Sequence, residues 1–142
     1  PKVLPAMLAS AGPTRDSFVE RSLRTSAVIG SKAYPSDEAT SIARAQETYD
    51  RGWTASGVTR QMLAVLTQPD RTKDLATLDL PVTVIHGLAD PLVNRSGGRA
   101  TAAAIPGAEQ LEIAGMAHDL PPELYSTYID AIDRTAKRAI SR

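Results

Sequence analysis

Two residues of the 142-residue sequence, Asp90 and His118, are of types that work together in acid–base chemistry. Asp90 follows the apolar, β-branched run 82–85, and His118 follows the run 108–113. In an open α/β sheet, side chains that come directly after parallel strands gather at the carboxyl edge. A carboxylate beside an imidazole orients the ring and stabilises its protonated form, so that the histidine can act as a general base and then as a general acid. The spacing therefore predicts a carboxylate–imidazole pair at one edge of a parallel sheet.

The same residues also have ordinary structural interpretations. Asp90 precedes Pro91, and aspartate is common in turns. His118 alone could be a loop histidine that caps or packs. Asp119 is a rival acid, but adjacent side chains point in different directions, so we rank it below Asp90. His86, at the end of the first strand, is interpreted as structural.

The strands that must carry this pair lie in the C-terminal half of the sequence. The run 82–85 is typical of a strand buried on both faces. Pro81 directly precedes it, at the position where the N–H that proline lacks is least needed for strand pairing. The second strand is predicted over 108–113. Two parallel strands are too few for a stable open sheet, so we expect the sheet to be incomplete.

Helices are predicted after each of these strands. An alanine-rich helix spans 97–105, with Ser96 as its N-cap. A terminal helix opens at Pro121-Pro122 and runs through Ile140, because proline suits the first turn of a helix. The residues expected on its inner face are Leu124, Tyr128, Ile129, Ile132 and Ala136. From residue 75 onward the pattern is therefore β–α–β–α.

The region before residue 72 reads as helical, with no convincing strand. One or two helical turns are predicted over residues 3–9. The three longer helices are predicted from Thr14 or Asp16 to Gly30, from Asp37 to Arg51, and from Ser56 to Thr67.

Composition excludes several classes of function. Sixteen basic and sixteen acidic residues cancel, so we expect no affinity for nucleic acid or for an anionic membrane surface. Cysteine is absent, which excludes a disulfide framework and a thiolate metal site. No apolar run reaches membrane-spanning length.

Two motifs resemble the α/β-hydrolase family. The segment VIHGLADPLV at 84–93 is similar to the stretch after the seventh strand of that fold, where G-x-x-D carries the acid of the catalytic triad. The segment GMAHDLP at 115–121 is similar to the loop after the eighth strand, where G-x-G/A-H carries the histidine. The helices of residues 13–72 look like the lid that many members insert after strand six. The resemblance covers essentially the whole chain and is closest to the esterase/lipase branch that includes aclacinomycin-methylesterase-like proteins.

The resemblance implies a fold class, a division of the chain and a partner. Residues 1–74 would be a helical lid, and residues 75–142 the C-terminal β–α–β–α part of an α/β core. The family places its nucleophile in an upstream G-x-S-x-G elbow, and this sequence contains none. The chain would then be the C-terminal half of a serine hydrolase, with Asp90 and His118 as catalytic residues. Its partner would be the N-terminal half, as a second chain or a covalent continuation.

The resemblance also implies a small-molecule ester or acyl substrate and neither a cofactor nor a metal. Four apolar residues are candidates for the acyl site, although apolar residues at helical spacing are more often plain core. They are Trp53, Met62, Leu92 and Met116.

Two other functions remain open at this point. The fold also supports haloperoxidase, C–C hydrolase and dehalogenase chemistry, and dehalogenases carry aspartate instead of serine at the elbow. A non-catalytic binding module on the same skeleton is the third possibility.

Overall fold

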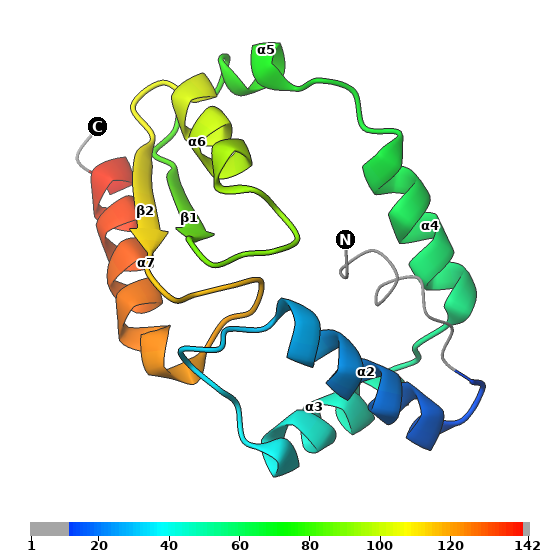
Figure 1. The fold of residues 1–142 in the computed structure, drawn as a ribbon. Coiled ribbons are helices and arrows are strands. Elements are labelled where there is room, and N and C mark those ends of the chain that lie inside the picture. The colour runs from blue at the N-terminus through cyan, green and yellow to red at the C-terminus, as the bar shows by residue number, and fades with distance from the viewer. Residues whose placement is uncertain (1–11, 141–142) are drawn as a thin grey trace. The chain divides into compact units, whose positions relative to one another are not determined.

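The computed structural model describes residues 12–140, which cluster into two compact units (Figure 1). The first unit contains residues 12–28 and 36–70, and the second contains residues 29–35 and 71–140. The helical turns predicted over residues 3–9 lie outside the described residues. The division into a lid (1–74) and a core (75–142) stays a prediction.

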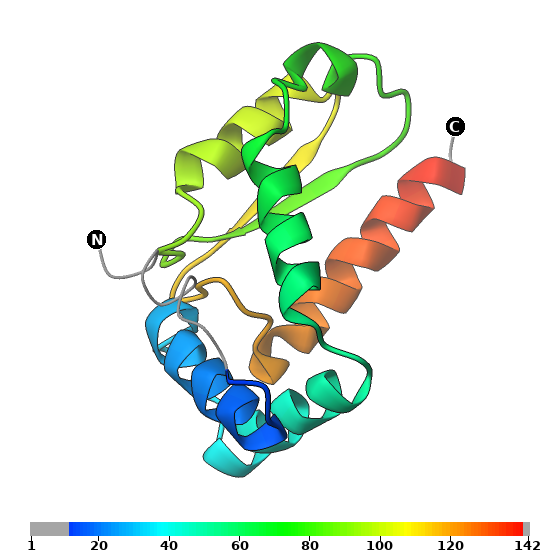
Figure 2. The same cartoon turned by 90° about the vertical axis from the view of Figure 1, so that its right-hand side faces the viewer.

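The second unit is a small α/β arrangement. Strands β1 (Thr83–Gly87) and β2 (Glu109–Ile113) pair in parallel, with Ile85 opposite Leu111. Helices α6 (Arg95–Ala104) and α7 (Tyr125–Ile140) cover opposite faces of this sheet (Figure 2). The strand–helix–strand–helix order predicted from the sequence is confirmed.

Two short helices complete the second unit. A 3-10 turn, η1 (Pro122–Leu124), precedes α7 and begins with the proline expected at a helix start. The four-residue helix α5 (Thr72–Leu75) was not predicted, because one turn is too short to show an apolar period.

The core of the second unit lies between the sheet and the start of α7. It is built on the buried side chains of Ile113, Met116 and Tyr128. The half-buried residues packed against it are Tyr34, Ile85, Leu111 and Leu124. Full burial of one such side chain is worth roughly 1.5–3 kcal/mol, so this cluster holds the end of β2 against α7.

Three expectations for the second unit are wrong in detail. Thr83, Val84 and Ile85 in β1 are only half-buried, because within residues 12–140 no further strand flanks β1. Ile129 and Ile132 point outward, with exposed fractions of 62% and 66%. The N-cap of α6 is Asn94, whose side chain accepts a hydrogen bond from the Ser96 amide at 3.0 Å.

The first unit is helical, as predicted. It contains α2 (Arg15–Ile29, whose last residue belongs to the second unit), α3 (Glu38–Asp50) and α4 (Ala55–Leu66). Asp37 caps α3 by accepting from the Thr40 amide at 2.8 Å, and Thr54 caps α4 by accepting from the Gly57 amide at 3.1 Å. These caps explain why both helices begin within one residue of the predicted positions.

An aromatic cluster forms the centre of the first unit. The Phe18 ring lies 5.0 Å from that of Trp53 and 5.7 Å from that of Tyr49, measured between centroids. Arg15 adds a two-point ion pair with Asp50 at 2.6 and 2.9 Å. These contacts tie α2 to the end of α3 and to the segment that follows it.

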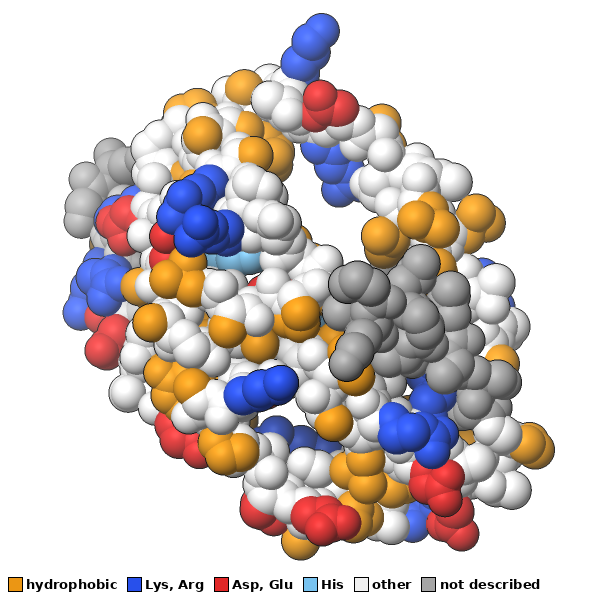
Figure 3. All heavy atoms as spheres, in the orientation of Figure 1, with side chains coloured by type: hydrophobic (Ala, Val, Ile, Leu, Met, Phe, Trp, Pro, Cys, Tyr) orange, Lys and Arg blue, Asp and Glu red, His pale blue; other side chains and the backbone are white. Residues whose placement is uncertain are grey.

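Helix α4 carries its apolar side chains largely in contact with solvent. Leu63, Val65 and Leu66 are all more than half exposed, and hydrophobic side chains are visible on the surface over this helix (Figure 3). Within residues 12–140, no helix has the length and apolar character needed to cross a membrane.

Candidate functional site

Asp90 and His118 meet at the carboxyl end of the sheet, as their positions in the sequence predicted. Nδ1 of His118 lies 2.8 Å from Oδ2 of Asp90. The Asp90 side chain is 7% exposed, whereas the His118 side chain is 39% exposed. The carboxylate is thus held inside the fold, and the imidazole that it contacts is open to solvent.

The Asp90 carboxylate is held by the turn that follows it. Its Oδ1 accepts hydrogen bonds from the amides of Leu92 and Val93 at 2.8 and 2.9 Å. Burial by itself raises the pKa of Asp90, but these two N–H donors and His118 outweigh it, so the pKa lies below its ordinary value. The carboxyl group is therefore ionised at neutral pH.

This ionisation decides which nitrogen of His118 carries the proton. A carboxylate only accepts hydrogen bonds, so Nδ1 must be the protonated nitrogen that donates to Asp90. In the neutral ring, Nε2 then carries the free lone pair. The arrangement is that of a general base whose tautomer is set by an acid.

Close packing of the main chain brings together the turn after β1, which carries Asp90, and the loop after β2, which carries His118. The Ala89 amide donates to the Met116 carbonyl at 2.9 Å. At Gly87, a Cβ atom would stand 2.4 Å from the Met116 carbonyl oxygen and 2.6 Å from that of Ala117. Only glycine permits this approach, which places the residues before His118 against the end of β1.

Residues 29–35, called here the strap, run along the other side of the loop 114–119, called here the histidine loop. The His118 amide donates to the Ile29 carbonyl at 3.0 Å. The Ala117 amide donates to Oγ of Ser31 at 2.7 Å. Sequence reasoning did not find Ser31, because its partners are distant in the chain and no motif surrounds it.

The rival acid Asp119 does not compete for His118. Its Oδ1 accepts hydrogen bonds from both the amide and the hydroxyl of Ser31. His86 is buried, with Nε2 3.1 Å from the Val93 carbonyl oxygen and its ring against Gly98. Both placements agree with the lesser roles that the sequence suggested for these residues.

The four candidate acyl-site residues lie in different surroundings. Leu92 is half-buried and adjoins Asp90 through its amide. Met116 is buried in the core of the second unit, where the Tyr128 hydroxyl donates to its sulfur at 3.5 Å. Trp53 stacks in the aromatic cluster of the first unit, and Met62 lies on α4. A substrate contact by any of the four stays a prediction.

The described residues contain no group of three or more histidine, aspartate or glutamate side chains that could hold a metal ion.

A comparison with solved structures gives a weak likeness. No protein-family model matches the sequence, and no curated protein matches it. Among solved structures, an esterase from a Rhodococcus species matches with a TM-score of 0.41 and 20% sequence identity. The match covers 75% of this chain and 47% of the esterase, so the chain spans about half the length of that protein. The chemistry of the site is therefore inferred from its own side chains.

Proposed function

We propose that the chain supplies the acid and the general base of a serine hydrolase that cleaves carboxylic esters. The observation that carries this proposal is the 2.8 Å contact between Nδ1 of His118 and the buried Asp90 carboxylate. A solvent-exposed imidazole with its tautomer set in this way is suited to take a proton from a hydroxyl nucleophile.

Each step of the proposed reaction uses the free Nε2 atom of His118. Nε2 takes the proton of a serine hydroxyl while the serine oxygen attacks the ester carbonyl. The protonated ring then gives this proton to the departing alkoxide as the ester C–O bond breaks. Water then attacks the acyl-enzyme carbonyl as the same nitrogen takes its proton, and the ring returns this proton to the serine oxygen as the bond from serine to the acyl group breaks and the acid leaves. Asp90 stabilises the imidazolium form that appears in each half of the cycle.

The nucleophile is proposed to come from a segment outside this sequence. The motif that presents a nucleophilic serine in this kind of fold, G-x-S-x-G, does not occur in it. The partner is therefore the polypeptide that carries this serine, either as a second chain or as a continuation of this one. A contact surface for such a partner has to adjoin the sheet.

The free edge of β1 is the surface at which we propose that this partner binds. Hydrogen bonds at the two ends of the ladder show which residues of this segment face β2. Glu109 N donates to Val82 O, and Leu88 N donates to Ile113 O, both at 3.0 Å. In a parallel ladder the alternate residues, here Thr83 and Ile85, then direct their main-chain groups to the other edge. In the described part of the chain the sheet has two strands, so this edge has no strand beside it.

The two edges of the sheet differ in character. On β2, Glu112 forms a two-point ion pair with Arg99 at 2.7 and 2.9 Å, and Gln110 also bonds to it. Charged side chains of this kind protect an edge strand from pairing. Strand β1 carries no acidic or basic residue other than the buried His86, so its edge is the one suited to take another strand.

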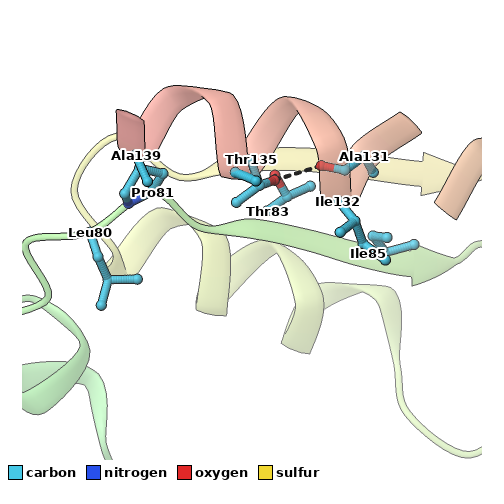
Figure 4. A pocket seen from close by; sticks show the side chains of 9 residues that line it. Leu80, Pro81, Thr83, Ile85, Ala131, Ile132, Thr135 and Ala139 are labelled. Carbon is cyan, nitrogen blue, oxygen red and sulfur yellow. Dashed lines mark hydrogen bonds between the residues drawn. The ribbon is translucent and has the colours of Figure 1, made fainter. Parts of the chain in front are cut away.

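An apolar groove of about 440 Å³ adjoins β1 and α7 (Figure 4). Its lining consists of Leu80, Pro81, Thr83, Ile85, Ala131, Ile132, Thr135, Ala136 and Ala139. An open strand edge beside an apolar groove leaves apolar surface in contact with water. We propose that an additional parallel strand with apolar side chains, from the polypeptide that carries the nucleophile, pairs with β1 and fills this groove.

Reconstitution with the nucleophile-bearing polypeptide tests the function. The assembled protein is expected to hydrolyse a short p-nitrophenyl ester and to react with a fluorophosphonate probe. His118→Ala should abolish both reactions, whereas the surface variant Asp133→Asn, on α7, should leave them unchanged. Hydrolysis that survives His118→Ala would refute the assignment. Failure of the unsubstituted assembly to react with the probe would instead favour a non-catalytic binding role.

A further inference from the structure

Three consecutive residues of the histidine loop are bonded to the strap. Ala117 N donates to Ser31 Oγ at 2.7 Å, and His118 N donates to Ile29 O at 3.0 Å. Asp119 Oδ1 accepts from the Ser31 amide at 2.9 Å and from the Ser31 hydroxyl. The Ser31 hydroxyl therefore accepts from one neighbour of His118 and donates to the other.

This contact is buried and closely packed. Ser31 and Ala117 are each 4% exposed. Nearby, the Tyr34 hydroxyl donates to the Ala114 carbonyl at 3.2 Å. Gly115 has a φ of +76°, and a Cβ atom there would stand 2.7 Å from Cβ of Ala33. The strap thus follows the histidine loop closely over most of its length.

The opposite side of the loop rests on the segment that carries Asp90. Ala89 N donates to Met116 O at 2.9 Å, next to the glycine contact described above. The main chain before His118 is therefore held between the strap and the end of β1. The imidazole is 39% exposed, so side-chain packing does little to orient it. Its direction depends on the hydrogen bond to Asp90 and on where the main chain of residues 117–119 is held.

We propose that Ser31, acting with Asp119, is a positioning residue that keeps His118 directed at Asp90. Its hydroxyl joins residues 117 and 119 across His118 and so sets the main-chain course from which the imidazole reaches the carboxylate. This role concerns the geometry of the Asp90–His118 pair. Only its kinetic consequence rests on the proposed hydrolase function.

The direct test reads the tautomer of His118 by nitrogen NMR of the intact protein labelled with ¹⁵N-histidine. Comparison with His118→Gln assigns the His118 signals. In the unsubstituted protein the neutral ring should carry its proton on Nδ1, because that nitrogen donates to Asp90. In Ser31→Ala the Nδ1–H population should fall at least about twofold in favour of the Nε2–H form, because Nδ1 is then no longer held against the Asp90 carboxylate that fixes the tautomer. The tautomer of His86 should be the same in both proteins.

Matched variants separate positioning from general loosening of the fold. Thr101→Val also removes a hydroxyl from the second unit, one that donates to Gly97 O within α6 at 2.9 Å, and it should leave the His118 tautomer unchanged. Asp119→Asn keeps an oxygen that accepts from Ser31 and should preserve the tautomer. Asp119→Ala should reproduce the effect of Ser31→Ala. The two Asp119 variants therefore test the positioning role even if Ser31→Ala does not fold.

Two outcomes would overturn the proposal. The first is an unchanged Nδ1–H population in folded Ser31→Ala and in Asp119→Ala. The second is an equal shift in Thr101→Val, which would make the effect one of general stability.

In the assembled hydrolase, Ser31→Ala should lower kcat about 10- to 100-fold with KM little changed, because a displaced general base weakens the chemical step more than binding. If the assembled protein has no esterase activity in any form, the proposed function fails. The tautomer measurement still decides the role of Ser31 in that case.

Discussion

The Asp90 carboxylate uses both of its oxygens, one for its own turn and one for His118. Oδ1 accepts the amides of Leu92 and Val93, and Oδ2 lies 2.8 Å from Nδ1 of His118. A single buried side chain therefore stabilises the turn after β1 and orients the imidazole that follows β2. Its charge contributes to stability as well as to chemistry.

The first prediction concerns pH and stability. The pKa of Asp90 in the folded chain is below its ordinary value of 3.8, so the ionised carboxylate favours the folded state. The stabilisation by the ionised carboxylate is fully present at pH values above the ordinary pKa of 3.8. It is lost as the pH falls through the lower pKa of the folded state. Asp90→Asn should reduce the free energy of unfolding by about 1–3 kcal/mol at neutral pH, since hydrogen bonds to a buried charge are lost. The deficit should shrink below about pH 4.

Urea unfolding at several pH values checks this prediction. Asp133→Asn is the control, because Asp133 lies in an exposed ion pair with Lys137, and such pairs contribute little. A deficit for Asp90→Asn that stays constant from neutral to acidic pH would contradict the assignment of the stabilisation to the ionised carboxylate.

The second prediction concerns the glycine between the two loops. Gly87→Ala places a Cβ atom 2.4 Å from the Met116 carbonyl oxygen, and main chain cannot move aside at low cost. We expect a loss of about 1–3 kcal/mol in the free energy of unfolding, as for other overpacked sites. Gly97→Ala is the matched control. Gly97 lies in α6, and a Cβ atom there would stand 3.7 Å from Cγ1 of Val93, which is an ordinary contact. Alanine at this position should stabilise by about 0.5–1 kcal/mol. Equal thermal midpoints for the two variants would be evidence against the close approach.

The sequence predicted the elements that position Asp90 and His118 because local signals mark them. The β-branched run 82–85 falls on β1, and the predicted strand 108–113 falls on β2. The cap at Asp37 and the prolines before α7 mark helix starts. The pairing of the acid with the histidine followed from the rule that parallel strands bring their carboxyl ends to one edge. Their separation of 2.8 Å is observed. Their catalytic roles stay proposals.

Long-range contacts outside the carboxyl edge of the sheet could not be predicted from one sequence. Nothing in the local sequence joins Ser31 to Asp119, although the two are in contact. Helical period placed Ile129 and Ile132 on the inner face of α7, but a period shows only that a stripe is apolar, not that this chain covers it. Asn94, not Ser96, is the N-cap of α6, because the helix begins two residues earlier than expected. Boundaries of this kind depend on the preceding turn, which Asp90 itself shapes.

The third prediction concerns the exposed apolar surface. Ile132 lines the groove beside β1, whereas Ile129, which is exposed to a similar degree on the same helix, does not. Ile132→Glu should weaken association with the nucleophile-bearing polypeptide at least about tenfold, because a buried charge without a partner is costly. Ile129→Glu should have a smaller effect. Isothermal titration calorimetry compares the two, and equal losses would place the contact elsewhere.

The same surface makes a prediction for the chain alone. An open strand edge beside an apolar groove favours self-association or poor solubility. Sedimentation of the isolated chain should show species larger than a monomer, and Ile132→Glu should shift them toward the monomer. A well-folded monomer at all concentrations would contradict the proposed use of this surface.

The last prediction separates the roles of Asp90 and His118 in the assembled hydrolase. His118→Ala removes the atom that moves the proton and should lower kcat by about 10⁴-fold or more. Asp90→Asn keeps the imidazole but replaces an acceptor by a group that can donate to Nδ1, which favours the wrong tautomer. A loss of about 10⁴-fold is typical when the orienting acid of a Ser-His-Asp triad becomes an amide. Steady-state hydrolysis of a p-nitrophenyl ester across a pH series measures both. Activity of Asp90→Asn close to that of the unsubstituted protein would show that the carboxylate serves the turn alone.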